Sequence, residues 1–228
     1  MRAKRHTDRI VIVTGGASGI GRGIARRFGE ERATVVVADV RETPKQGERY
    51  DSDVTIPTAE LIGTETPGTA SYVETDVSDP ASVEAMIEET VARHGGIDVL
   101  VNNAGIQAIG TAETTTIEDW ETSIAVDLSG VYHCAKYAIP HLKASAGQLI
   151  NIGSVRGLEG GGGPSYAAAK GGVVNLTRDL ATELGSSGVR VNCINPGYIE
   201  TPLQDYLTAD DIEDSAAHTL LDRFGTPE

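Results

Sequence analysis

A tyrosine and a lysine stand four residues apart in GGGGPSYAAAK, residues 160–170. Residues at this spacing share one face of a helix, so the sequence predicts the Tyr166 phenol beside the Lys170 ammonium. A neighbouring positive charge stabilises a phenolate and lowers the pKa of a tyrosine from its usual value of about 10. The pair is therefore a candidate general acid or base for a hydroxyl proton. The alternative for Tyr166 is a half-buried packing residue.

Ser154 is the third candidate, because it follows the apolar run GQLINIG twelve residues before Tyr166. Its hydroxyl could hydrogen-bond a substrate oxygen and position the carbon that carries it. The alternative is a hydroxyl that caps a helix or a turn.

A glycine-rich turn, TGGASGIG at residues 14–21, lies between a predicted strand and a predicted helix. Gly15, Gly19 and Gly21 let the backbone turn tightly and approach a pyrophosphate, and the helix N-terminus offers free N–H groups. Alone, such a turn also fits a plain strand-to-helix connection. Asp39 ends the next predicted strand, where a carboxylate accepts ribose hydroxyls and repels a 2′-phosphate. This predicts NAD over NADP, although Arg41 favours the opposite cofactor.

These residues need an alternating framework. Apolar runs typical of strands occur at 10–15, 34–39, 71–76, 97–105, 147–154 and 189–197, and helical segments at 19–31, 80–94, 117–144 and 166–185. The alternation predicts an α/β fold with a Rossmann-like, doubly wound parallel sheet in three α/β/α layers. We expect one domain over residues 1–228. Ligands of such sheets bind beyond the carboxyl ends of the strands, where each motif above lies.

The set of motifs resembles the short-chain dehydrogenase/reductase family. TGGASGIG, NNAG at 102–105, Ser154, Tyr166 with Lys170, and NPGYIET at 195–201 match that family in order, within a resemblance covering residues 8 to about 227. The resemblance implies an NAD(P)-dependent oxidoreductase that interconverts a secondary alcohol and a ketone. Tyr166 would be the general acid or base, Ser154 would orient the substrate oxygen, and Lys170 would tune the tyrosine and bind the nicotinamide ribose.

The resemblance also assigns the cofactor site. Asp76 and Val77 would lie at the adenine, the NNAG residues along the ribose, and Ile199 and Thr201 near the carboxamide, while Ser18 stands where many NADP-preferring relatives carry a basic residue. The open alternatives are a helix cap for Asp76, core packing for Val77 and structural hydrogen bonding for Asn102. The full set implied is Gly15, Ser18, Gly19, Ile20, Gly21, Asp39, Asp76, Val77, Asn102, Ala104, Gly105, Tyr166, Lys170, Pro196, Gly197, Ile199 and Thr201.

Asp127, in SIAVDLSG, departs from the family pattern, which has an asparagine in a water relay behind the lysine. We count Asp127 with Ser154, Tyr166 and Lys170 as the catalytic set. A carboxylate lacks the amide donors and is expected to raise the pKa of Lys170. The alternative is a neutral substitution.

Two further departures concern length. Residues 41–68 contain three prolines and are expected to form a loop with a short helix at about 57–62. The segment is either a plain surface loop or an insertion like that of the family branch that holds NAD tightly and passes electrons to another carrier. The family usually continues past RFGTPE with a helix and a last strand, so we expect a C-terminally truncated chain in which both are missing.

Composition narrows the partners. Acidic residues outnumber basic ones 33 to 19, giving a formal net charge of −14. We expect no nucleic-acid or membrane partner, a salt-adapted surface typical of a halophile, and a cytoplasmic protein with free thiols at Cys134 and Cys193. The scattered histidines predict no metal site. We expect a small-molecule substrate and a homo-oligomer, dimer or tetramer, if the full C-terminus is present.

The substrate itself is left open. Leu203, Tyr206, Leu207 and Leu220 either line an apolar pocket or pack in the core. The alternative to an enzyme is a nucleotide-binding sensor or assembly protein without turnover, which Asp127 and the short C-terminus favour.

Overall fold

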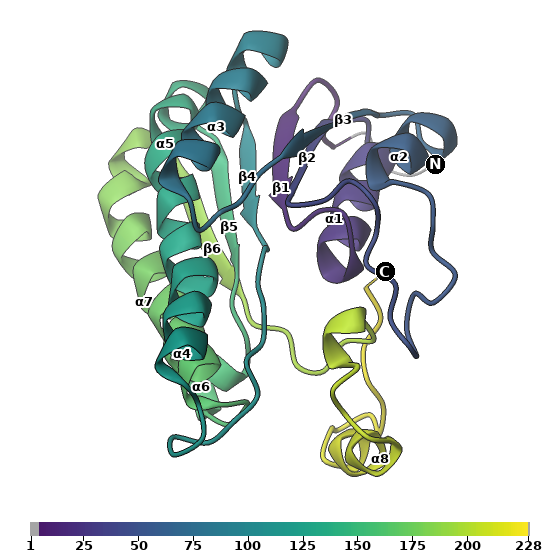
Figure 1. The fold of residues 1–228 in the computed structure, drawn as a ribbon. Helices are drawn as coiled ribbons and strands as arrows, with labels where there is room; N and C mark the ends of the chain where they lie inside the picture. Colours follow the sequence, from purple (N-terminus) through teal and green to yellow (C-terminus); the bar gives the residue numbers. More distant parts are fainter. Residues whose placement is uncertain (1–4, 228) are drawn as a thin grey trace.

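The computed structural model describes residues 5–227, and its centre is a parallel sheet (Figure 1). The strands are β1 Ile10–Thr14, β2 Thr34–Asp39, β3 Thr69–Glu74, β4 Val99–Asn102, β5 Gln148–Ile152 and β6 Arg190–Ile194. Their order is β3-β2-β1-β4-β5-β6, so the winding reverses between β1 and β4. The predicted Rossmann-like fold is confirmed, and the switch point lies where the glycine turn and NNAG meet.

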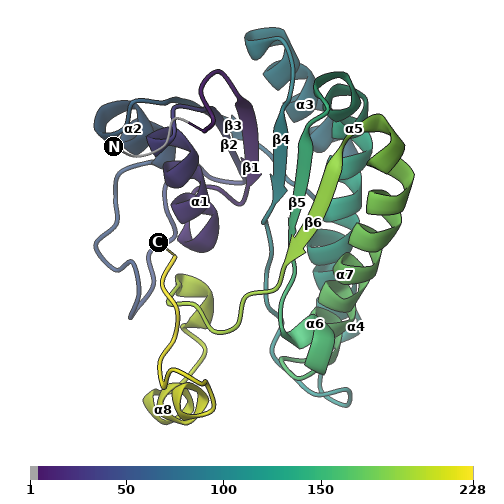
Figure 2. The same ribbon diagram turned by 180° about the vertical axis from the view of Figure 1, so that it is seen from behind.

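Helices cover both faces of the sheet, which makes three layers (Figures 1 and 2). Helices α1 and α2 lie on one face, and α3, α4, α5 and α7 lie on the other. Short helices α6 and α8 lie at the carboxyl ends of the strands. Their bounds are α1 Gly19–Glu30, α2 Thr58–Glu65, α3 Pro80–His94, α4 Ile117–Ile124, α5 Gly130–Ser145, α6 Arg156–Glu159, α7 Pro164–Leu184 and α8 Ala209–Ala217. Within the described range, no helix is both long and apolar enough to cross a bilayer.

The sheet residues divide between two cores because side chains alternate along a strand. Val11 and Val13 pack with α1 and α2 through Ala25 and Ile62, whereas Ile12 between them packs against α3 and α5. All five are fully buried. Burying a side chain of this size contributes about 1.5–3 kcal/mol, so both layers are tied firmly to the strands that carry the site.

The long helix expected over 117–144 is interrupted. A π-helical turn at Ala125–Ser129 separates α4 from α5. The wider turn places Asp127 inside the molecule, where it is fully buried. Such turns are rare within α-helices and occur often at functional sites.

The segment 41–57 has no regular structure, and α2 begins at Thr58, as the three prolines predicted. It is fixed to α1 because one Arg22 guanidinium nitrogen donates to the Ile56 carbonyl at 2.8 Å and to the Thr58 hydroxyl at 3.0 Å. A loop held in this way lies in a defined position beside the glycine turn.

Candidate active site

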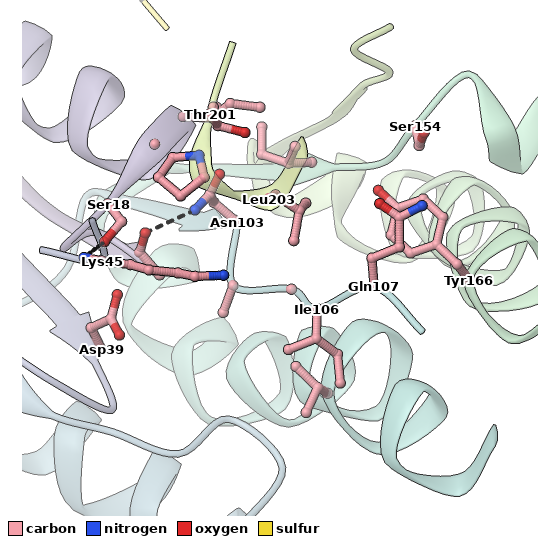
Figure 3. A pocket seen from close by; sticks show the side chains of 18 of the residues that line it. Ser18, Asp39, Lys45, Asn103, Ile106, Gln107, Ser154, Tyr166, Thr201 and Leu203 are labelled. Atoms are coloured by element: carbon pink, nitrogen blue, oxygen red, sulfur yellow. Dashed lines mark hydrogen bonds between the residues drawn. The ribbon is translucent and has the colours of Figure 1, made fainter. Parts of the chain in front are cut away.

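A cavity of about 760 Å³ lies at the carboxyl ends of the strands and runs from Asp39 to Tyr166 (Figure 3). Residues from distant motifs meet in its wall. The predicted site residues that line it are Gly15, Ser18, Gly19, Ile20, Asp39, Asp76, Val77, Ala104, Gly105, Ser154, Tyr166, Lys170, Pro196, Gly197, Ile199 and Thr201. Their individual roles stay predictions, but one cavity holds both the nucleotide motif and the tyrosine.

The glycine turn forms a cradle that tolerates no side chains. Gly15 and Gly19 have φ of +62° and +50°, and a Cβ on Gly15 would lie 2.7 Å from the Ala104 Cα. Gly21 lies beneath the turn rather than in the cavity wall, because a Cβ there would lie 2.1 Å from the Gly15 carbonyl. Helix α1 starts beside this cradle with no acidic residue in its first turn. The site therefore fits a dinucleotide pyrophosphate, which needs close backbone approach and a positive helix end.

Asp39 stands at the far end of the cavity from Tyr166 (Figure 3). One carboxylate oxygen accepts the Ala17 N–H at 3.0 Å, which fixes it against the glycine turn. Burial raises the pKa of Asp39, while hydrogen bonds from the backbone N–H groups of Ala17, Arg41 and Val40 lower it. The carboxylate is thus held rigidly beside the cradle.

The catalytic candidates meet at the other end. The Lys170 Nζ lies 5.6 Å from the centroid of the Tyr166 ring and donates to the Ile152 carbonyl at 3.1 Å. A side-chain hydrogen bond joins Ser154 to Tyr166. The Ser154 Oγ also accepts the Arg156 N–H at 3.1 Å, so this serine does cap a turn as well as face the cavity.

The glycine run in GGGGPSYAAAK explains how Tyr166 is presented. Gly160 to Gly163 all have positive φ, between +77° and +92°, which side-chain-bearing residues rarely adopt. The run connects α6 to α7, and Pro164 occupies the first turn of α7, where a proline is tolerated. Tyr166 therefore lies in the first turn and Lys170 one turn deeper.

The pKa of Tyr166 moves in the direction opposite to the sequence-based prediction. Burial raises it to about 12, the Ser154 hydrogen bond lowers it and the Asp127 charge raises it. The sequence suggested the nearby cation but gave no measure of burial, which is the largest influence on the Tyr166 pKa in the protein alone.

Asp127 and Lys170 form a buried ion pair, with Lys170 Nζ 3.8 Å from Asp127 Oδ1. The same oxygen accepts the Ile106 N–H at 3.0 Å, and Oδ2 has no hydrogen-bond partner. Burial raises the pKa of Asp127 to about 6, against the lowering effect of Lys170. The pKa of Lys170 is lowered by burial, and Asp127 opposes this only in part. The expected raising effect of Asp127 on the Lys170 pKa is thus present, but burial outweighs it.

This arrangement, with the nucleotide cradle and the tyrosine at two ends of one cavity, agrees with the comparison with known families. Residues 9–212 match the family described as short chain dehydrogenase. The chain belongs to the short-chain dehydrogenase family. Membership makes it an oxidoreductase and implies a nicotinamide cofactor.

Related short-chain dehydrogenases act on several kinds of alcohol. A meso-2,3-butanediol dehydrogenase of Serratia marcescens is 40% identical over 198 residues, covering 86% of this chain and 74% of that protein. A cis-4-hydroxycyclohexanecarboxylate dehydrogenase of Sinomonas cyclohexanicum is 38% identical, covering 97% and 85%. A 3-oxoacyl-acyl-carrier-protein reductase of Thermotoga maritima is 36% identical, covering 98% and 87%. All three share the chemistry of a hydroxyl-bearing carbon.

The side chain of one predicted cofactor residue of this short-chain dehydrogenase points away from the cavity. Asn102 does not line the cavity but is buried, where its side chain donates to the Asn151 side chain at 2.9 Å and to the Val131 carbonyl at 3.3 Å. The alternation of side chains along a strand explains this position of Asn102. Its side chain points to the same face of β4 as that of Leu100, toward α5. Asn103 lines the cavity instead and donates to the Thr14 and Gly15 carbonyls at 2.9 and 3.1 Å.

The substrate end of the dehydrogenase includes residues that no motif indicated. Ile106, Gln107, Ile109 and Val126 line it, and Gln107 Nε2 donates to the Tyr206 hydroxyl at 3.2 Å. Of the apolar candidates after the PG motif, Leu203 and Tyr206 line the cavity, Leu207 is buried and Leu220 is fully exposed. Only the position just after NNAG could have suggested Ile106 and Gln107.

The Asp127 carboxyl makes the stability of the dehydrogenase depend on pH. Its pKa is about 6 in the folded protein and 3.8 in the reference state, so its contribution is present below pH 3.8 and lost as the pH rises through 6. We expect the stability of Asp127→Asn, taken relative to that of the natural protein, to increase from pH 4 to pH 7 by up to about 3 kcal/mol, because only the natural protein has the titrating carboxyl. Denaturant unfolding at several pH values measures this. Parallel curves for the two proteins would contradict it, and Asp210→Asn on α8 is the exposed control.

Proposed function

We propose that this short-chain dehydrogenase uses NAD to interconvert a small neutral secondary alcohol and its ketone, with Tyr166 as general acid or base. One observation supports this proposal most strongly. Ser154, Tyr166 and Lys170 lie at one end of the cavity, and Asp39 and the glycine cradle lie at its other end. The decisive experiment is turnover on a panel of alcohols, diols, sugars and acyl substrates with NAD and NADP.

The proposed chemistry assigns one task to each side chain. During oxidation, ionised Tyr166 removes the hydroxyl proton, and Ser154 holds the same oxygen by a hydrogen bond. The Lys170 charge stabilises the phenolate, and Asp127 behind it keeps the lysine protonated. When bound, the nicotinamide ring accepts the hydride from the carbinol carbon and, in its oxidised form, brings a positive charge beside Tyr166.

The preference for NAD rests on Asp39. Its carboxylate is fixed by the Ala17 N–H, so it cannot easily withdraw from a 2′-phosphate. Arg41 lies in the same wall and would attract that phosphate. Because Asp39 is the held and more buried group, we assign the larger effect to its charge.

Asp39→Asn isolates this charge, since the amide oxygen can still accept the Ala17 N–H. We expect the ratio of kcat/KM with NADP to kcat/KM with NAD to rise at least about tenfold, or 1.4 kcal/mol. Steady-state kinetics with both cofactors on one substrate give the ratio. An unchanged ratio would mean that residues other than Asp39 discriminate between NAD and NADP. Asp210→Asn again serves as the surface control.

The lining of the substrate end supports a neutral substrate. Ile106, Ile109, Val126 and Leu203 are apolar, while Gln107 and Tyr206 offer hydrogen bonds. Among the described lining residues, the only cationic side chain at this end is Lys170, which Asp127 already pairs. A diol or a cyclic alcohol fits these groups, in keeping with the butanediol and hydroxycyclohexanecarboxylate dehydrogenases among the relatives.

The second candidate is a nucleotide-binding sensor or assembly protein without turnover. The buried Asp127 favours it, because its charge raises the pKa of the tyrosine that must ionise. Calorimetric binding of NAD without cofactor reduction on any substrate of the panel would support it, and turnover would exclude it.

We also propose a cytoplasmic homo-oligomer with a salt-adapted surface. The net charge of −14 and the scarcity of lysine support the salt dependence. Thermal unfolding and sedimentation at low and high salt address both points. For residues 41–68 two roles stay proposed: a plain surface loop, or an insertion that helps to hold NAD.

A further inference from the structure

The 41–57 segment contributes Arg41 and Lys45 to the cavity wall and is fastened by hydrogen bonds to two other parts of the chain. On the side of α1, the Lys45 N–H donates to the Ser18 Oγ in the glycine turn at 2.6 Å. The Glu48 N–H donates to the Asp205 Oδ2 at 3.1 Å, after the PG motif. The segment thus links the nucleotide cradle to the region around α8, and Figures 1 and 2 show it running between them. One fastening is made by Lys45 itself and the other by Glu48, three residues further along the chain.

Lys45 itself lines the cavity. Its side chain is exposed and, in Figure 3, lies extended across the cavity from Ser18 toward the side of Asn103. No ion pair within 4.0 Å joins it to any acidic group among residues 5–227. The ammonium is therefore directed into the cavity without being neutralised there.

Three cationic side chains line the cavity, those of Lys170, Arg41 and Lys45. Lys170 lies at the catalytic end in its pair with Asp127, and Arg41 follows Asp39 at the adenosine end. Lys45 lies next to the glycine cradle, because its N–H is hydrogen-bonded to Ser18. Three carboxylates, Asp39, Asp76 and Asp205, also line the cavity, so an anionic ligand enters against a negative field. A cation beside the cradle is the group that offsets this field at the pyrophosphate.

We propose that Lys45 binds the pyrophosphate of the nicotinamide dinucleotide, as a cation that the 41–57 segment holds over the glycine cradle through Ser18 and Asp205. The inference rests on the proposed dinucleotide binding and adds a residue that no motif of the chain assigns. The backbone N–H groups of the cradle contact the pyrophosphate from below, and Lys45 contacts it from the open side.

The test is the affinity for NADH and NADPH, measured by cofactor fluorescence, in Lys45→Gln. We expect the Kd of both cofactors to rise about five- to tenfold, and the salt dependence of binding to weaken. Lys143→Gln, exposed in the last turn of α5, is the matched control and should bind as the natural protein does. Because Lys45 is exposed, no loss of folding is expected, and circular dichroism checks this.

The outcomes separate the two proposals. If the natural protein binds neither cofactor, the proposed function itself is contradicted, whatever the Lys45→Gln variant does. If it binds and Lys45→Gln binds equally well, the Lys45 proposal is overturned. A loss confined to NADPH would also overturn it, because Lys45 would then contact the 2′-phosphate.

The fastening to Asp205 gives an independent measurement. Asp205→Asn keeps an oxygen for the Glu48 N–H and removes the charge, whereas Asp205→Ala removes both. We expect NADH to dissociate about three- to tenfold faster from Asp205→Ala than from Asp205→Asn in stopped-flow experiments, since only the former releases the segment. In the Lys45→Gln background this difference should shrink. Equal dissociation rates in the natural background would overturn the positioning role.

Discussion

Tyr166→Phe is expected to lower kcat/KM by about 10²–10⁴-fold, because it removes the phenol that we propose exchanges the hydroxyl proton. Ser154 and Lys170 remain, so the NADH affinity should change less than twofold. Steady-state kinetics on the best substrate of the panel, together with an NADH titration, measure both quantities. The half-buried ring of Tyr166 can be replaced by a phenylalanine ring of similar size, so folding should be preserved.

Tyr132→Phe supplies the control, since Tyr132 on α5 is half exposed and lies outside the cavity wall. Unchanged turnover in Tyr166→Phe would remove the mechanism. In the natural protein, oxidation should also accelerate as the pH rises, because the pKa of Tyr166 is raised to about 12 by burial and the reactive form is the phenolate.

Lys170→Met is the substitution with the second large expected effect, and it should lower both the free energy of unfolding and turnover. Removing the lysine leaves Asp127 buried without its ion-pair partner, and one carboxylate oxygen already lacks a hydrogen bond. We expect a loss of about 2–4 kcal/mol in the free energy of unfolding at pH 8. The loss should be smaller at pH 5, below the pKa of about 6 for Asp127, where the carboxyl is protonated. Turnover should fall at least about 100-fold, since the phenolate loses its cation.

A double variant separates the charge from the packing. Lys170→Met with Asp127→Asn should recover stability at pH 8 relative to Lys170→Met alone, because no buried charge remains, but it should not recover turnover. Denaturant unfolding at pH 5 and pH 8 gives the stabilities. Equal losses at both pH values, or no recovery in the double variant, would show that the pair is not the source of the instability.

Local pattern predicted most of the framework. The apolar runs over 34–39 and 10–15 became β2 and β1 almost unchanged, and the prolines of residues 41–68 correctly predicted a loop before a short helix. The π turn at Ala125–Ser129 was not predictable in this way, because its residues continue the helical pattern on either side. Its position depends on packing against α7 and the loop that holds Ile106.

Within the site, the sequence identified kinds of residue better than their surroundings. It indicated NNAG as a cavity motif and left Asn102 either at the ribose or in structural hydrogen bonding. The structure shows that strand alternation turns this side chain toward α5. It gave no sign that Lys45, from a proline-containing loop, lies over the cradle. A loop's path follows its anchoring hydrogen bonds, here those to Ser18 and Asp205, and these partners lie 27 and 157 residues away along the chain.

The sequence by itself determined the α/β framework, the glycine cradle and the spacing of Tyr166 and Lys170, since each depends on residues close together in the chain. Only the tertiary structure decided the direction of the pKa shifts, the orphaned oxygen of Asp127 and the course of the 41–57 segment. The physical reason is that burial and charge pairing are summed over all neighbours in space. Local sequence carries no measure of that sum, and at Tyr166 burial is the largest influence on the pKa.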